Sequence, residues 1–171
     1  MNCEFIRSPG KKELIAQLEE QFGITELPYL LLETGKEKIR GFSGSMTKDE
    51  IISLSRLINV EIIGLYLFKK EEGSKRMRLS LDATHLLSSQ LTKNVIEITD
   101  EQKEIWLRGN NLDIKTNSGM VLVKNKNIFL GCGLSTGKNI INHIPKERRI
   151  RFSAEKYKIR DALRKEQHVQ P

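Results

Sequence analysis

The sequence predicts an α+β protein, with an N-terminal α+β domain built on a mostly antiparallel sheet, then a small β-barrel, then a basic helical tail. Apolar residues recur at helical spacing in two segments of the first half, and strand-like runs lie between and after them. Two apolar runs flank the polar residues 124–127, which indicates a tight β-hairpin. Positive charge gathers towards the C-terminus.

Residues 1–90 are expected to form the first domain. Ser8 before Pro9 indicates a helix N-terminus with Ser8 as the N-cap, and Gly23 ends that helix. Thr47 and Glu50 have capping-box spacing at a second helix. The side chains expected on the buried helix faces are Leu14, Ile15, Leu18 and Phe22, then Ile51, Ile52, Leu54, Leu57 and Ile58. Strands are expected over 29–33, 38–42, 61–68 and 76–81, with 2–7 as an edge strand or an arm and 82–90 as a helical turn.

The second domain is expected to span 94–152. It begins with a strand over 95–98 and a capping box at Thr99 and Gln102, whose helix places Ile105 and Trp106 on its inner face. Arg108 and Gly109 end this helix, and the hairpin follows. Further strands are expected over 140–144 and 146–152, the second with basic side chains in solvent. Glycines at 131, 133 and 137 mark places where a strand bends or another part of the chain comes close.

The charge distribution suggests a polyanionic partner. Residues 1–93 carry 14 basic and 13 acidic side chains, whereas residues 94–171 carry 15 and 9. Ten of those basic residues lie in 138–171, where the spacing over 154–165 is helical. Nucleic acid is the first candidate and an anionic membrane the second. A basic tail that is merely solvated remains the alternative.

Composition places the chain among cytoplasmic globular proteins. Apolar residues make up 38% and charged residues 30%, and no apolar run approaches the roughly 18 residues that suggest a membrane span. The N-terminus lacks the pattern of a secretory signal. Cys3 and Cys132 lie far apart, which argues against a disulfide framework and fits a reducing compartment.

Motifs for catalysis or cofactors are weak, so no enzyme activity, cofactor or metal is expected. Residues 132–139 resemble a phosphate-binding loop, but Cys132 stands where its first glycine belongs and Asn139 where it needs Ser or Thr. The three histidines have no metal-ligand spacing. Cys132 is the one candidate nucleophile, and a small residue in a crowded bend is the preferred interpretation. Trp106 is expected in the core rather than as a base-stacking platform.

The second domain resembles a PUA domain, an RNA-binding module named for pseudouridine synthases and archaeosine transglycosylases. The resemblance rests on the strand over 95–98, the helix ending at Arg108 and Gly109, the strand over 120–124 and the segment 127–133 with its Gly-Cys-Gly turn. The first domain, with its segment 76–87, looks like the pre-PUA domain of large-ribosomal-subunit assembly factors of the nuclear-import-protein-seven type and their archaeal relatives. The basic tail over 153–171 departs from that layout.

The resemblance implies a non-catalytic protein that binds rRNA or a tRNA-like structured RNA as a ribosome-assembly factor, with assembly or RNA-modification proteins as further partners and no membrane. The implied RNA-binding residues are Arg108, Gly109, Lys146, Arg148, Arg149, Arg151, Lys156 and Lys158. Two alternatives stay open. The chain could be an accessory subunit of an RNA-modifying enzyme such as an RNA cytosine methyltransferase, or a protein-interaction scaffold that uses its first domain.

Overall fold

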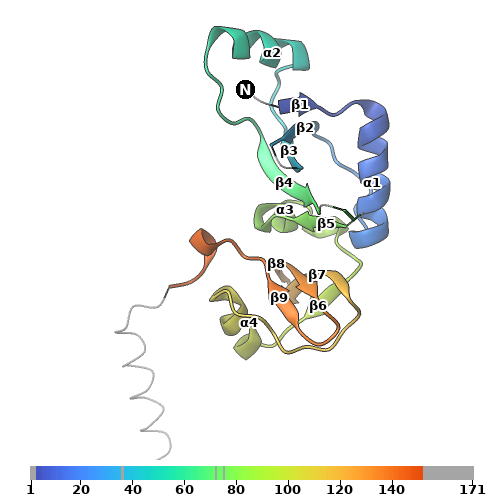
Figure 1. The fold of residues 1–171 in the computed structure, drawn as a ribbon, viewed down its shortest axis with the longest axis vertical. Coiled ribbons are helices and arrows are strands. Elements are labelled where there is room, and N and C mark those ends of the chain that lie inside the picture. Colours follow the sequence, from blue (N-terminus) through green and yellow to red (C-terminus); the bar gives the residue numbers. More distant parts are fainter. Residues whose placement is uncertain (1–2, 36, 72, 75, 152–171) are drawn as a thin grey trace, which may run out of the picture.

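The computed structural model describes residues 3–35, 37–71, 73–74 and 76–151. It contains two stacked units, each with its own sheet (Figure 1). The first sheet is antiparallel with strand order β1-β2-β3-β4-β5, and the second is mixed with order β6-β7-β8-β9. The predicted α+β class is therefore confirmed. Among the described residues, no helix has the length and apolar character needed to cross a membrane.

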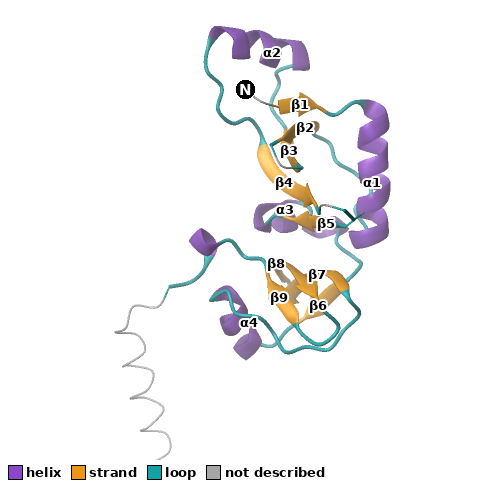
Figure 2. Ribbon diagram, viewed as in Figure 1, coloured by secondary structure: helices purple, strands orange, loops and turns teal. Residues whose placement is uncertain are grey.

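The first unit carries its helices on both faces of its sheet (Figure 2). Its elements are β1 Cys3–Phe5, α1 Ser8–Phe22, β2 Leu30–Thr34, β3 Lys38–Phe42, α2 Lys48–Leu57, β4 Leu65–Lys70, β5 Met77–Leu79, α3 Leu81–Leu86 and the 3-10 helix η1 Ser88–Gln90.

The second unit follows η1 directly. Its elements are β6 Val95–Glu97, α4 Asp100–Leu107, β7 Gly119–Asn125, β8 Ile128–Ser135, β9 Ile140–Asn142 and the 3-10 helix η2 Lys146–Arg148. A single bridge from Leu112 to Ile140 extends the sheet beyond β9.

Helix α1 packs along the inner face of the first sheet. It buries Leu14, Leu18 and Phe22, which lie on one stripe because they are four residues apart. It ends at Gly23 with φ +87°, as predicted. Its N-cap is Arg7, without a side-chain cap, so the prediction that Ser8 is the N-cap is wrong by one residue.

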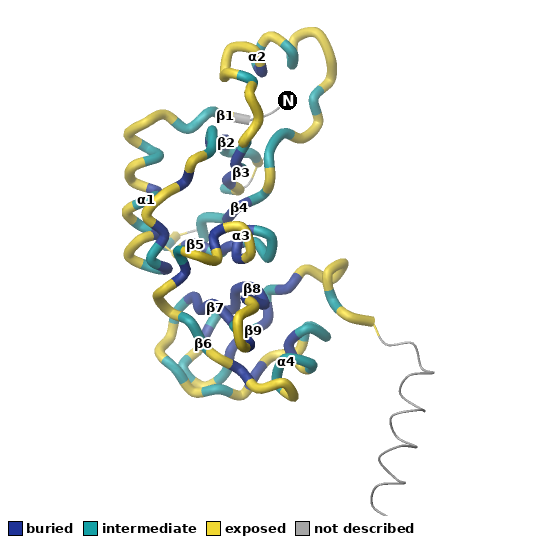
Figure 3. The backbone as a smooth tube through the Cα atoms, turned by 180° about the vertical axis from the view of Figure 1, so that it is seen from behind, coloured by how far each residue is buried: buried dark blue, intermediate teal, exposed yellow. Residues whose placement is uncertain are grey.

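Helix α2 forms as predicted but buries little. Its capping box is present, since the Thr47 amide donates to Glu50 Oε2 at 2.7 Å and the Glu50 amide donates to Thr47 Oγ1 at 3.3 Å. Of the side chains predicted to be buried, only Ile51 is, whereas Leu57 and Ile58 are 81% and 56% exposed. The helix projects beyond the sheet and covers only one end of it, so most of its apolar stripe has no surface to pack against (Figure 3).

The β7–β8 hairpin is confirmed, with a shorter turn than the polar run suggested. Asn125 pairs with Ile128, so only Lys126 and Asn127 form the turn, and Lys126 has φ +54°. Gly133 lies where a Cβ atom would be 2.7 Å from the Trp106 ring, so only glycine fits under that indole. This is the close approach that the glycine pattern predicted.

The strand predicted over 146–152 does not form. Arg148 and Arg149 donate their amides to Pro145 and Lys146, which makes a local 3-10 turn rather than a ladder. The alternation of charged and apolar residues there reflects exposure to solvent, because 145–151 is exposed except for half-buried Arg149. Phe152 and the predicted helical tail lie outside the described residues.

Strand β7 is buried on both faces. Met120 and Leu122 join the hydrophobic cluster of the first unit, whereas Val121 and Val123 pack in a second cluster around Trp106 of α4. Successive strand residues point to opposite faces, so this continuous apolar run serves two cores. The first cluster contains residues from both sides of 90–94, the expected domain boundary. That boundary stays a prediction.

The shared core predicts that damage to the hairpin destabilises the whole chain. Leu122→Ala should lower the free energy of unfolding by about 2–5 kcal/mol, because Leu122 is fully buried. Urea unfolding followed by circular dichroism measures this. Ile128→Ala, on the same hairpin with 52% exposure, is the matched control and should cost well under half as much. Equal costs would contradict the two-faced packing of β7.

Candidate functional site

The structure brings the predicted basic residues of the second unit to one edge, where the chain leaving β9 passes the C-terminal end of α4. The Ile150 amide donates to the Leu107 carbonyl at 2.9 Å, which holds the two segments together. We call the described residues Arg108, Gly109, Lys146, Arg148, Arg149 and Arg151 the basic edge. Lys156 and Lys158 lie outside the described residues.

Gly109 and Arg149 meet at the centre of the basic edge. Gly109 has φ +87°, and a Cβ atom there would overlap the Arg149 side chain. Arg149 is half-buried and donates its Nε to the Ile144 carbonyl at 3.0 Å. The guanidinium therefore lies over a backbone that has no side chain of its own, in a fixed orientation.

Asn142 locks the elements beneath this edge, and sequence reasoning missed it. Its Nδ2 donates to the carbonyls of Trp106 at 2.7 Å and Asn110 at 3.1 Å, and its Oδ1 accepts from the Ile144 amide at 2.8 Å. The side chain is 8% exposed, so these bonds satisfy groups that water cannot easily reach. A polar residue inside the apolar run 140–144 was the signal that could have found it.

The residues of the basic edge differ in whether their charges form ion pairs with acidic side chains. Arg148 Nη2 lies 3.2 Å from Asp82 Oδ2 of α3, and Arg108 Nη2 lies 3.4 Å from Glu104 Oε2. Lys146 and Arg151 are exposed and form no ion pair with any residue that the structure describes. Their charges are therefore available to an anion.

The Arg148–Asp82 pair also joins the two units, since Asp82 belongs to α3 and Arg148 to η2. Both side chains are substantially exposed, at 55% and 40%, so the pair adds little stability. A phosphate group could replace the Asp82 carboxylate at Arg148 at small cost.

Trp106 is a core residue, as predicted. It is fully buried and donates its indole Nε1 to the Leu130 carbonyl at 2.8 Å. It cannot stack on a nucleotide base without unfolding α4. Ile105 was expected beside it on the inner face, but that side chain is 43% exposed, so this prediction is wrong.

Cys132 is packed in the first hydrophobic cluster at 3% exposure. Burial raises the pKa of its thiol to about 12, so the group is protonated at neutral pH and is a poor nucleophile. Residues 132–135 belong to β8, and Thr136 closes the following turn by bonding Asn139, so this segment is not a phosphate-binding loop. No three His, Cys, Asp or Glu side chains in the described ranges are arranged to hold a metal ion.

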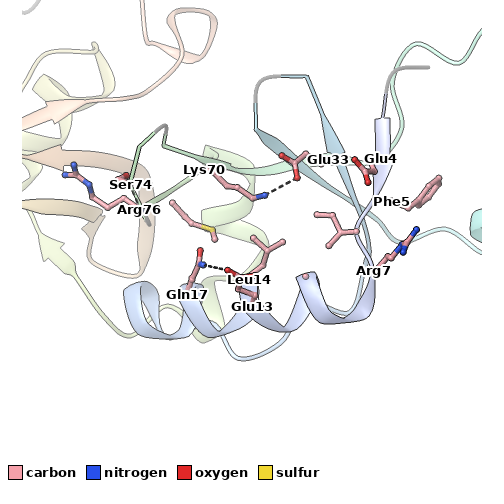
Figure 4. A pocket seen from close by; sticks show the side chains of 13 residues that line it. Glu4, Phe5, Arg7, Glu13, Leu14, Gln17, Glu33, Lys70, Ser74 and Arg76 are labelled. Atoms are coloured by element: carbon pink, nitrogen blue, oxygen red, sulfur yellow. Dashed lines mark hydrogen bonds and ion pairs between the residues drawn. The ribbon is translucent and has the colours of Figure 1, made fainter.

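A cavity of about 380 Å³ lies in the first unit between α1 and the inner sheet face (Figure 4). Glu33 and Lys70 pair across it at 3.0 Å, and Gln17 donates to Glu13 at 3.3 Å. The lining mixes acidic and basic side chains, so the cavity has no single sign of charge, whereas the charged side chains of the basic edge are all positive.

Comparison with known families agrees with this geometry. Residues 93–150 match the family described as the methyltransferase RsmF PUA domain. This segment is therefore a PUA domain of the RsmF methyltransferase type, and PUA domains typically bind RNA. It includes every described residue of the basic edge except Arg151. No curated protein sequence matches the chain.

Gly109→Ala should destabilise the protein by more than the strain of a left-handed backbone alone, which is about 1–2 kcal/mol. The added methyl group must also displace the Arg149 side chain. Urea unfolding measures the loss. Gly73→Ala is the control, since Gly73 has φ +68° with no atom within 4 Å of a Cβ. If both variants lose the same stability, Arg149 does not pack on Gly109.

Cys132 should resist alkylation in the folded protein. In a Cys3→Ser background, iodoacetamide at pH 8 should leave the remaining thiol unmodified, because it is both buried and protonated. Rapid modification should follow the addition of urea, which serves as the positive control. Mass spectrometry gives both measurements. Fast labelling of the native protein would mean that Cys132 is accessible and ionised.

Proposed function

We propose that this chain is a non-catalytic RNA-binding protein that binds RNA through the basic edge of its PUA domain. The observation that carries the proposal is that the segment matching the PUA family also brings most residues of the basic edge together on one described surface. Neither the family match nor the group of basic residues alone would identify the RNA-binding surface. Together they support a proposal that this surface binds RNA.

The geometry supports phosphate contacts rather than base reading. Lys146 and Arg151 offer exposed charges that can replace condensed counterions on an RNA backbone. Arg149 is held against Gly109, where the missing side chain lets a sugar-phosphate backbone come close. Contacts of this kind position an RNA and do not read its sequence. Lys156 and Lys158 would extend the same surface.

We further propose that the RNA is ribosomal and that the protein assists ribosome assembly. This proposal rests on the likeness of the first unit to pre-PUA domains and on the core that the two units share. An RNA held at the basic edge would place the first unit at a defined position on that RNA. The protein would then act as an adaptor between RNA and assembly proteins.

A second candidate function is that of an accessory RNA-binding subunit of an RNA-modifying enzyme. The matched family is named for a methyltransferase, which favours this alternative. The buried, protonated Cys132 is itself a poor nucleophile. A third role, as a protein scaffold, would use the exposed apolar side chains near α2, such as Leu57 and Ile62.

Replacing the two exposed charges Lys146 and Arg151 should weaken RNA binding without loss of stability. Lys146→Gln with Arg151→Gln should lower the affinity for a structured ribosomal RNA fragment by about 1–3 kcal/mol. The slope of log K against log salt should fall by about two, since each phosphate contact contributes about 0.9 in duplex regions. Fluorescence anisotropy of the full chain at several salt concentrations measures both.

The control pair is Lys12→Gln with Lys93→Gln, which removes the same charge from the α1 side of the first unit. It should bind RNA nearly as tightly as the wild-type protein. Equal affinity of the edge variant and the wild-type protein would move the RNA site elsewhere. Absence of binding by the wild-type protein at low salt would reject the RNA-binding proposal and favour the scaffold role.

A further inference from the structure

The face of the first sheet opposite α1 carries a row of basic residues across three neighbouring strands. Lys38 of β3 pairs with Lys69 of β4, and Lys69 pairs with Arg78 of β5. Directly opposed residues share a face of the sheet. Their strand neighbours Ile39, Phe68 and Leu79 are buried against α1, which places the basic row on the outer face.

This arrangement costs stability, because like charges in directly opposed positions repel one another. Neighbouring strands are about 4.8 Å apart, so the row holds three cations within about 10 Å. Arg78 has a partial counter-charge in Glu71, at 3.2 Å. Lys38 and Lys69 form no ion pair with any residue in the described ranges. The fold therefore keeps Lys38 and Lys69 opposite each other without a described counter-charge, next to the Arg78–Glu71 ion pair.

An aromatic side chain lies beside this row. Tyr66 of β4 is half-buried and pairs with Arg40 of β3 on the same face. Arg40 donates its Nη1 to the Gly64 carbonyl at 2.8 Å, and its positive charge lies within electrostatic range of the Tyr66 hydroxyl. A row of cations next to an aromatic ring is the combination that binds single-stranded nucleic acid, because phosphates contact the cations while a base stacks on the ring.

Helix α2 covers a different part of this face, whereas Tyr66 lies on the side of the second unit, within electrostatic range of Cys132. The helix covers the opposite end of the outer face, where Lys48 lies 5.6 Å from the centre of the Phe5 ring and Leu32 is fully buried. Leu32 is the partner of Phe5 in the sheet. Two residues further along β2, Thr34 is the partner of Lys38, the first residue of the basic row. The basic row therefore begins where the cover of α2 ends.

The outer face continues towards the second unit. Burial lowers the pKa of His143, and the positive charge of Arg78 lowers it further while Glu71 opposes the shift. His143 therefore lies within electrostatic range of this end of the row. It follows β9 directly and precedes Pro145, where the segment of the basic edge begins.

We propose that the outer face of the first sheet is a second RNA-contact surface, on which Lys38, Lys69 and Arg78 bind the phosphates of a single-stranded RNA segment and Tyr66 stacks on one of its bases. This inference rests on the proposed RNA-binding function and extends it: the basic edge holds a structured RNA, and a strand leaving that RNA crosses onto the first unit. The positive row is kept at a cost in stability because it binds this strand.

The affinity of the full chain for a fluorescein-labelled oligouridylate of about 12 nucleotides can be measured from the fluorescence anisotropy of the label. Lys38→Gln with Lys69→Gln should weaken binding about tenfold and lower the salt slope by about 1.4, since each phosphate contact on a single strand contributes about 0.7. The melting temperature should stay the same or rise, because a repulsive pair is removed. Tyr66→Leu should weaken binding by about fivefold or more, and Tyr66→Phe, which keeps the ring, should restore it.

The outcomes separate this inference from the function on which it rests. Unchanged affinity in the outer-face variant, with affinity lost in Lys146→Gln/Arg151→Gln, would overturn the second surface and leave the basic edge in place. An equal loss in the control Lys12→Gln/Lys93→Gln would show a general charge effect and would also overturn it. Absence of binding by the wild-type protein to both the oligouridylate and the structured fragment would reject the two proposals together.

Discussion

The second sheet has apolar cover on both faces, and the arrangement of the rest of the molecule depends on this constraint. Strand β7 contributes Leu122 to the core of the first unit and Val123 to the core under α4. A strand that is apolar on both sides needs two covering layers, because either face left in water would forfeit the free energy of burying it. The first unit supplies one layer and α4 with the loop around Leu112 supplies the other.

This packing has a consequence for RNA binding. Since the two units share one hydrophobic cluster, the basic edge and the outer face of the first sheet are held in a fixed relation. The Arg148–Asp82 pair adds an electrostatic link at the surface. A ligand that contacts both surfaces would then lose little protein entropy on binding, because the protein needs no rearrangement.

Some basic side chains of the basic edge are held by contacts within the protein, whereas others are exposed and can contact a ligand. Arg149 is fixed by the Ile144 carbonyl and by its contact with Gly109, whereas Lys146 and Arg151 are exposed. Net charge alone does not distinguish these roles. Long-range attraction of an RNA depends on the whole charge distribution, but the contacts that persist in the complex depend on which groups are not already bound to protein.

The sequence by itself determined the local structure. Capping boxes at Thr47 and Thr99, the helix ends at Gly23 and Gly109 and the β7–β8 hairpin were all predictable, because caps, turns and periodicity depend on residues close together in the chain. The PUA character of the second unit was predictable for the same reason, since it rests on the order of such elements.

Only the tertiary structure decided which surfaces are covered and which side chains meet. The apolar stripe of α2 could be predicted from the sequence, but its exposure to solvent could not, because burial depends on whether another layer of structure packs against the stripe. The segment 146–151 alternates like a strand, but 146–148 form a 3-10 helix and no strand edge among the described residues pairs with the segment. The row from Lys38 to Arg78 joins residues about 40 positions apart, so it exists only once strand order and register are set.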